Sequence, residues 1–268
     1  MATASLNPLL RNNVNITGNG EVVIMFAHGF GCDQNMWRFV APRFEDQYTV
    51  VLFDHVGSGN SDLQAYDPEK YRSLTGYADD IVEIIRALDR GKVIFVGHSV
   101  SALMGIMAAV KSPGLFEKLV LVGPSPSYIN DGDYVGGFDR GEIDEMLAAL
   151  DNNHLGWSMS MAPVIMGNPD RPELGEELAG SFCRAEPSIA RQFARTTFLS
   201  DGRQYLSQCP VPSLVLQCSS DVIAPVEVGE YVHRHLPDSR FVMLDAVGHC
   251  PNLSAPEETT AAIKQFLN

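Results

Sequence analysis

Ser99 stands in the segment Gly97-His98-Ser99-Val100-Ser101, between an apolar run, Val93 to Val96, and a stretch of small residues. A serine in a sharp turn from a strand into a helix has its Oγ lifted clear of the sheet, and the helix N-terminus faces any negative charge that forms beside it. We therefore expect Ser99 to be a nucleophile. An ordinary loop between a strand and a helix can have the same residue types, so further residues must decide.

A serine nucleophile needs a histidine that takes its proton and a carboxylate that orients the histidine, and here the acid should precede the histidine in the chain. Asp221 follows the apolar run Ser213 to Cys218, and His249 follows the apolar run Phe241 to Leu244. We predict that Asp221 is the acid and His249 the general base. Asp245 is the weaker alternative for the acid. Because His249 must be neutral to accept a proton, activity should rise through roughly pH 6.5, the ordinary imidazole value.

A glycine-rich loop, His28-Gly29-Phe30-Gly31, follows the apolar run Val22 to Ala27. A tetrahedral acyl intermediate has a negative oxygen, which two backbone N–H groups can stabilise. We predict that the N–H groups of Phe30 and Val100 form this oxyanion hole. Of the other polar residues nearby, His28 should shape this loop, and Asp54 should hold the turn at Gly57-Ser58-Gly59. His98 should point away from the nucleophile as structural support, and His55 should have only a packing or surface role.

The whole chain resembles proteins of the α/β-hydrolase fold, and more closely the group that contains the bacterial stress-response regulator RsbQ and the plant strigolactone and karrikin receptors. The matching segments are His28–Gln34, Phe53–Gly59, Gly97–Ser101, Gly123–Ser127, Gly136–Phe138 and Gly248–Ser254. The details at Asp170–Glu173 and Gly248–Pro251 are most similar to RsbQ. The resemblance implies a Ser-His-Asp triad beneath a four-helix lid, hydrolysis of small esters or lactones, and a role in signalling. Ser101 replaces the last glycine of the usual G-x-S-x-G pattern, and a serine is small enough to be tolerated there.

Short apolar runs alternate with helical stretches through most of the chain. Near-continuous apolarity indicates strands covered on both faces, hence a mostly parallel sheet flanked by helices, an α/β fold. Before them, Asn13 to Thr17 and Glu21 to Ala27 should form a hairpin through Gly18-Asn19-Gly20. The later runs are Thr49 to Phe53, Val93 to Val96, Leu119 to Val122, Leu214 to Leu216 and Phe241 to Leu244.

Residues 127–199 show helical periodicity and no strand pattern, which predicts a four-helix lid inserted into a core formed by residues 1–126 and 200–268. The helices should lie around Ile143 to Leu150, over Trp157 to Ile165, over Glu173 to Phe182, and from Pro187 onward. Since α/β folds bind ligands at the carboxyl ends of their strands, the lid should cover an apolar substrate pocket above Ser99. The residues we expect to line it are Phe138, Trp157, Met161, Phe193 and Phe198.

Composition limits the partners. The 268 residues include 19 basic and 33 acidic side chains, a net charge of −14 that disfavours binding to nucleic acid and to anionic membranes. The five cysteines form no C-x-x-C pair, the start of the chain does not have the pattern of a signal peptide, and no apolar run is long enough to span a membrane, so we expect a cytoplasmic protein. The histidine spacing favours no metal site, and the predicted chemistry requires no cofactor.

The sequence thus predicts a serine hydrolase that cleaves a small, largely apolar ester or lactone through an acyl-enzyme. The resemblance leaves a second hypothesis open, a ligand sensor that turns its ligand over slowly and binds a signalling protein through the lid. A third is a non-catalytic domain that retains the triad as a relic. Turnover distinguishes the first two, because an esterase completes many cycles and a sensor few.

Overall fold

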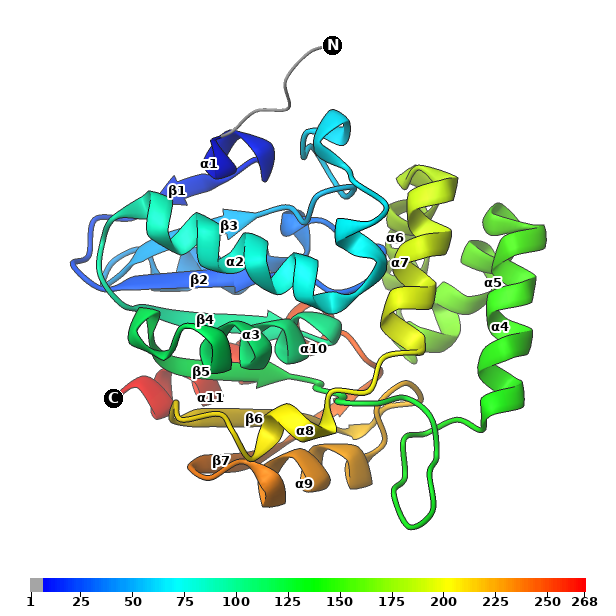
Figure 1. The fold of residues 1–268 in the computed structure, drawn as a ribbon. Coiled ribbons are helices and arrows are strands. Elements are labelled where there is room, and N and C mark those ends of the chain that lie inside the picture. Colours follow the sequence, from blue (N-terminus) through cyan, green and yellow to red (C-terminus); the bar gives the residue numbers. More distant parts are fainter. Residues whose placement is uncertain (1–6) are drawn as a thin grey trace.

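A seven-stranded, mostly parallel sheet forms the centre of the computed structural model, which describes residues 7–268 (Figure 1). The strand order is β1-β3-β2-β4-β5-β6-β7, and every pair except β1·β3 is parallel. The strands are β1 (Asn15–Thr17), β2 (Val23–Ala27), β3 (Thr49–Phe53), β4 (Val93–His98), β5 (Phe116–Val122), β6 (Ser213–Ser220) and β7 (Ser239–Val247).

Helices cover both faces of this sheet, which explains why its central strands, such as β2 and β4, are apolar and buried without alternation. Along β2, the side chains of Val23, Met25 and Ala27 pack into one core cluster, and those of Ile24 and Phe26 into the other. The first cluster lies under α2 (Leu74–Leu88), α3 (Val100–Lys111) and α9 (Val226–His235); the second lies under α11 (Pro256–Leu267). The short helices are α1 (Pro8–Arg11), α8 (Arg203–Leu206) and α10 (Pro251–Ser254).

The predicted hairpin is wrong. β1 pairs antiparallel with β3, Asn15 opposite Leu52, because both edges of β2 are already occupied by β3 and β4. The connecting residues do not form a tight turn. Gly18 and Gly20 instead pass close to the segment before β3. A Cβ on Gly18 would lie 2.3 Å from the Tyr48 carbonyl oxygen, and a Cβ on Gly20 would lie 2.1 Å from the Gln47 carbonyl oxygen.

All four helices predicted for residues 127–199 form. They are α4 (Arg140–Asn152), α5 (His154–Met166), α6 (Pro172–Arg184) and α7 (Pro187–Phe198), and we call this segment the helical insertion. The insertion lies beyond the carboxyl ends of the strands, on the right in Figure 1. Through residues 7–268, no helix combines the length and the apolarity that crossing a membrane requires.

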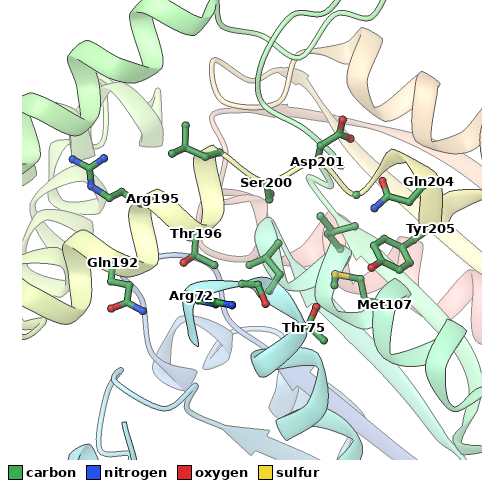
Figure 2. Close-up of a pocket in the computed structure, with 15 residues that line it drawn as sticks. Arg72, Thr75, Met107, Gln192, Arg195, Thr196, Ser200, Asp201, Gln204 and Tyr205 are labelled. Atoms are coloured by element: carbon green, nitrogen blue, oxygen red, sulfur yellow. The ribbon is translucent and has the colours of Figure 1, made fainter. Parts of the chain in front are cut away.

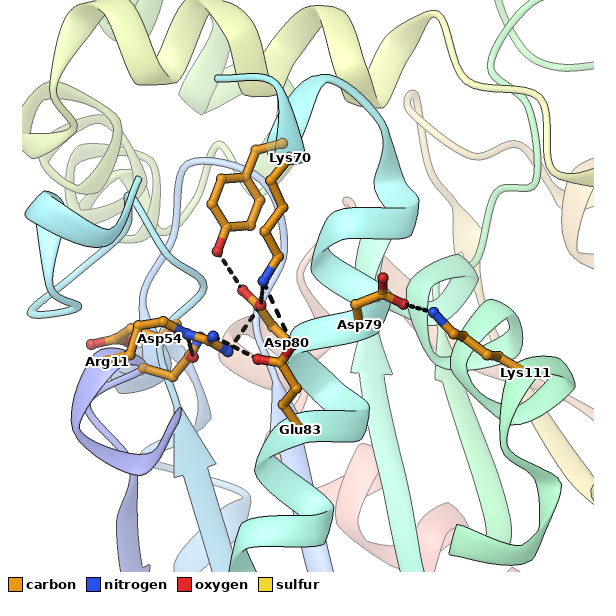
Figure 3. Close-up of polar contacts among 9 residues, drawn as sticks. Arg11, Asp54, Lys70, Asp79, Asp80, Glu83 and Lys111 are labelled. Atoms are coloured by element: carbon orange, nitrogen blue, oxygen red, sulfur yellow. Dashed lines mark hydrogen bonds and ion pairs between the residues drawn. The ribbon is translucent and has the colours of Figure 1, made fainter. Parts of the chain in front are cut away.

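A buried ionic cluster joins the first helix to α2 (Figure 3). The Asp80 carboxylate is 1% exposed and lies 2.9 Å from an Arg11 guanidinium nitrogen and 2.5 Å from Lys70 Nζ. It also accepts a hydrogen bond of 2.7 Å from the Tyr71 hydroxyl. Burial raises the pKa of Asp80, and the charges of Arg11 and Lys70 oppose that rise. This cluster fixes α1 and the segment before α2 against the core.

Candidate active site

Ser99 occupies the turn between β4 and α3. Its backbone has φ 57° and ψ −125°, a region that a non-glycine residue enters at a cost of about 1–3 kcal/mol. Its N–H donates to the Val122 carbonyl at 2.8 Å, which ties the turn to the neighbouring strand. Gly97 permits the tight crossing, because a Cβ there would lie 2.5 Å from the Ser101 carbonyl oxygen. The strained turn therefore presents the Ser99 hydroxyl at the end of the sheet, as predicted from the sequence.

His249 and Asp221 meet Ser99 at this end of the sheet. Ser99 Oγ lies 2.7 Å from His249 Nε2, and His249 Nδ1 lies 2.6 Å from an Asp221 carboxylate oxygen. All three residues are buried. After β7, Gly248 lies so close to α5 that a Cβ would be 1.8 Å from the Met166 carbonyl oxygen, and the His249 N–H donates to Ile165 at 2.9 Å. The helical insertion thus helps to position the imidazole.

The Asp221 carboxylate sets the direction of this hydrogen-bond chain. Burial raises the pKa of Asp221, but His249 and the N–H groups of Ala224 and Ile223 outweigh it and hold the pKa below its ordinary value. An ionised carboxylate accepts the Nδ1–H of the imidazole, which leaves Nε2 free to accept the proton of the Ser99 hydroxyl. Asp245, the weaker alternative for the acid, is exposed and bonds Glu258 through its N–H at 2.9 Å instead.

Phe30 and Val100, the predicted oxyanion-hole residues, lie in the loop after β2 and directly after Ser99, respectively. Val100 is the first residue of α3, so its N–H has no partner within the helix. The loop with Phe30 packs against β4, since a Cβ on Gly29 would lie 2.7 Å from His98 Nδ1. Phe30 and Ser99 line the same small cavity.

A buried polar network joins the Phe30 loop to α3. The Ser101 hydroxyl donates to the His28 carbonyl at 2.5 Å, and His55 Nε2 donates to Ser101 Oγ at 2.7 Å. His28 Nδ1 donates to the Gly29 carbonyl at 2.9 Å, as expected for a residue that shapes this loop. The expectation of only a packing or surface role for His55 was wrong, because its partner, Ser101, is 46 residues away and no local spacing reveals it.

His98 and Asp54 also act on the site through backbone groups. The prediction that His98 points away from the nucleophile is wrong, because its ring packs beside the triad: its centroid lies 5.1 Å from that of the His249 ring, and its Nε2 donates to the His249 carbonyl at 2.7 Å. Its role as structural support agrees with this contact. The Asp54 carboxylate accepts from the N–H groups of Asn60 at 3.0 Å and Gln34 at 2.9 Å, and thereby holds the turn at Gly57–Gly59 against the first glycine-rich loop.

A small, mostly apolar cavity of about 30 Å³ lies over Ser99. Besides Ser99, two residues with hydroxyl groups line it, Tyr128 and Thr197, and burial raises the pKa of Tyr128 to about 12. The other lining side chains come from both the core and the helical insertion: Phe30, Cys32, His98, Ile165, Leu178, Phe182, Phe198, Ile223, His249 and Cys250.

The five predicted pocket residues divide into three groups. Phe198 lines the cavity over Ser99. Trp157 and Phe193 lie one layer behind, with ring centroids 6.3 Å and 5.5 Å from that of Phe30. Phe138 and Met161 are partly buried against the core, and neither is among the cavity-lining residues. Two lining residues that the sequence analysis missed are Tyr128, which lies before the helices of the insertion, and Thr197, a polar residue in the last turn of α7. The hydrophobic periodicity that predicts the helices marks neither of them.

A separate groove of about 540 Å³ lies between the start of α2 and the end of α7 (Figure 2). Arg72, Thr75, Gln192 and Gln204 are among the residues that line it, and Ser99, Asp221 and His249 are not. This groove is therefore not the site of the Ser99 chemistry.

The comparisons agree with this geometry. A model of the Alpha/beta hydrolase family matches residues 24–263. The chain belongs to the alpha/beta hydrolase family. A hydrolase from Oleispira antarctica has a similar solved structure, with a TM-score of 0.95 and 41% identity over 100% of this chain and 98% of that one.

Plant relatives in this family are similar over almost their whole length. A strigolactone esterase of Arabidopsis thaliana is 40% identical, with 95% of this chain and 94% of that protein covered. A karrikin insensitive 2 receptor of Petunia hybrida is 38% identical, with 92% of each chain covered. The relatives of this alpha/beta hydrolase thus include both proteins named as esterases and proteins named as receptors.

Proposed function

We propose that the protein is a serine hydrolase that cleaves small esters or lactones through an acyl-enzyme. The observation that carries this proposal is the chain of short contacts from Ser99 through His249 to Asp221, next to a strained turn and a cavity. It is supported by the 40% identity, over 95% of this chain, to a plant protein that is named as an esterase.

In the proposed reaction, Ser99 Oγ attacks the substrate carbonyl while its proton passes to His249 Nε2. The N–H groups of Phe30 and Val100 stabilise the negative oxygen, and removing one such donor typically costs about 2.7–4 kcal/mol of transition-state stabilisation. His249 then returns the proton to the leaving alcohol. A water molecule, activated by His249, releases the acid and restores the Ser99 hydroxyl. Asp221 keeps the imidazole in the tautomer that both halves need.

Intact-protein mass spectrometry after a serine-directed phosphonate tests this proposal. We expect one adduct on the wild type, located at Ser99, and none on Ser99→Ala, together with loss of p-nitrophenyl acetate hydrolysis in the variant. Cys183→Ser is a suitable control, because this thiol is partly exposed and lies outside the cavity. If Ser99→Ala retains the adduct or the hydrolysis, Ser99 is not the nucleophile and the triad is a relic.

A ligand sensor is the second function that the relatives favour, since several of them are named as receptors. In that case the helical insertion acts as a lid that binds a signalling protein after slow turnover. Pre-steady-state kinetics with a butenolide distinguishes the two. Many cycles per enzyme support the esterase, and a single burst followed by a stable adduct supports the sensor. The likeness to RsbQ and a cytoplasmic location remain predictions.

A further inference from the structure

A groove of about 680 Å³ lies beside the cavity over Ser99, between the core and the junction of α6 and α7. We call it the outer groove. It is lined by three segments: Phe30–Asp33, the Gly57–Asn60 turn with Leu63, and residues from Ser181 to Phe193. Its size lies in the range of ordinary small-molecule sites, about 300–1,000 Å³.

Phe30 separates the outer groove from the cavity. Phe30 and Cys32 line both of them. The Phe30 ring has four aromatic neighbours, with centroid distances of 5.5–6.3 Å, and these four are buried, whereas Phe30 itself is partly exposed. The residue whose N–H is proposed to bind the oxyanion therefore has a side chain at the boundary of two spaces of very different size.

The difference in size between the cavity and the outer groove indicates where each half of an ester substrate would lie. The acyl group is bonded to Ser99 during the reaction and must fit the cavity, whose volume of about 30 Å³ is less than a twentieth of the 680 Å³ of the outer groove. A butyryl or longer chain would need the packed aromatic side chains to move. The alcohol leaves the site, and two spaces share lining residues with the cavity: the outer groove through Phe30 and Cys32, and a smaller hollow of about 280 Å³ through Cys32 and Leu178. The outer groove is the larger of the two and is the one bounded by Phe30, whose N–H is proposed to bind the oxyanion, so it is the space that suits a bulky leaving alcohol.

The outer groove has an apolar floor and a polar rim. Phe30, Ile189 and Phe193 form the floor. On the rim, Arg184 lies 3.3 Å from Asp33, so its charge is already paired, and Glu186 accepts from the Ile189 N–H at 2.9 Å as the cap of α7. The side chains of Ser58 and Asn60, partly and fully exposed, make no hydrogen bond to any of residues 7–268. Such a surface suits an uncharged, ring-sized alcohol with hydrogen-bonding groups.

We propose that the outer groove binds the alcohol part of the substrate, and that the preferred substrates are esters of a short acid, of acetyl size, with a bulky uncharged alcohol. This inference rests on the proposed function, because it assumes an ester that reacts at Ser99. It goes further by naming which half of the ester is small and where the large half lies.

The first test is a pair of substrate series. Across p-nitrophenyl acetate, butyrate and hexanoate, we expect kcat/KM to fall by about tenfold or more from the first to the last. Across ethyl acetate and 1-naphthyl acetate, the larger alcohol should have the lower KM. A hexanoate ester that is cleaved as well as the acetate overturns the assignment of the small half.

The second test fills the outer groove. Ala185 lines it, is partly exposed, and has an extended backbone, so Ala185→Trp places a ring in the groove without backbone strain. We expect the ratio of kcat/KM for 1-naphthyl acetate to that for ethyl acetate to fall by about tenfold. Gln204→Trp, in the groove of Figure 2, is the matched control and should leave the ratio unchanged. An unchanged ratio in Ala185→Trp overturns the proposal.

A binding measurement separates failure of this inference from failure of the proposed function. Ser99→Ala should bind 1-naphthyl acetate, as followed by intrinsic tryptophan fluorescence, and adding Ala185→Trp or Ala185→Phe should weaken the binding by about tenfold. If the wild type hydrolyses no ester but the double variants still show this loss of binding, the proposed reaction is wrong, and the assignment of the outer groove as a binding site is retained. If the wild type is an active esterase and the double variants bind as tightly as Ser99→Ala, the outer groove does not bind the alcohol part, and the proposed reaction is retained.

Discussion

The Ser101 hydroxyl donates a hydrogen bond of 2.5 Å to the His28 carbonyl and thereby joins the helix that follows the nucleophile to the loop that contains Phe30. His55 Nε2 donates to the same hydroxyl at 2.7 Å, so Ser101 has both a donor and an acceptor partner in a fully buried position. A glycine at this position, as in the usual motif, would lack this connection. Ser101 therefore acts as a positioning residue for the proposed oxyanion hole.

Ser101→Ala should lower kcat by about tenfold with little change in KM, because the Phe30 N–H would no longer be held at the position that the oxyanion takes in the transition state. Stopped-flow measurement of acylation by p-nitrophenyl acetate checks this. Thr260→Val is the control, since it removes a buried hydroxyl in α11 far from the site and should leave kcat unchanged. A rise in KM with constant kcat in Ser101→Ala would contradict the positioning role.

Thr197 offers a hydroxyl at the wall of the cavity. Its Oγ1 is buried, and it has no hydrogen-bond partner among residues 7–268. A buried unsatisfied hydroxyl costs about 1–3 kcal/mol, so Thr197→Val should raise the free energy of unfolding by about 1 kcal/mol in the absence of substrate. Thermal unfolding measures this change.

The same variant should bind a butenolide less tightly than the wild type does, because the ring oxygen would lose a donor. Thr260→Val should give a similar gain in stability without any change in KM. Equal KM values for the butenolide in wild type and Thr197→Val would show that this hydroxyl does not contact the substrate.

His98 makes stability depend on pH. Burial, and next the charge of His249, lower the pKa of His98 to about 3. An unfolded chain binds a proton at this histidine below about pH 6.5, and the folded protein does not, so the free energy of unfolding falls as the pH falls below 6.5, by up to about 1.4 kcal/mol per pH unit. Above pH 6.5 this contribution is fully present.

Urea unfolding of wild type and His98→Gln between about pH 5 and pH 7 isolates this effect. Glutamine retains an N–H donor for the His249 carbonyl but does not titrate. The free energy of unfolding of the variant should therefore fall less steeply as the pH falls, by up to about 1.4 kcal/mol per pH unit less than that of the wild type, which corresponds to one proton. The comparison with wild type is needed because Asp80, whose pKa burial raises, contributes with the opposite sign. Parallel pH profiles would mean that His98 is charged in the folded protein.

The sequence was sufficient to predict the meeting of Ser99, Asp221 and His249. Each follows a strand, and the carboxyl ends of parallel strands lie at one edge of a sheet, so chain order and hydrophobic runs were enough. The parallel sheet and the four helices of the insertion follow from periodicity in the same way.

The pairing of β1 and the lining of the cavity could not be predicted in this way. β1 has three exposed residues, so no burial pattern identifies its neighbour, and the preference for a local hairpin misleads. Phe193 and Phe198 lie on the same helix and are both buried, yet one lines the outer groove and the other the cavity. Which side of Phe30 each contacts depends on how α7 packs on the core.

The Asp80 cluster of Figure 3 provides a prediction about stability alone. Asp80→Ala removes the buried carboxylate that lies 2.9 Å from the Arg11 guanidinium and 2.5 Å from Lys70 Nζ. Losing one partner of a buried ion pair costs about 3–5 kcal/mol, and the remaining contact of Arg11 with the half-exposed Glu83 at 2.6 Å should keep the cost at the lower end of that range. The matched control is Lys111→Met, which removes the ion pair between Lys111 on α3 and Asp79, the neighbour of Asp80 on α2. Both side chains of this pair are partly exposed, 54% and 32%, and such pairs contribute about 0–1 kcal/mol. Urea midpoints at constant m-value measure both changes. Because the cluster lies away from Ser99, the folded fraction of Asp80→Ala should hydrolyse p-nitrophenyl acetate at the wild-type kcat. Equal destabilisation by the two variants would mean that the cluster is effectively solvated.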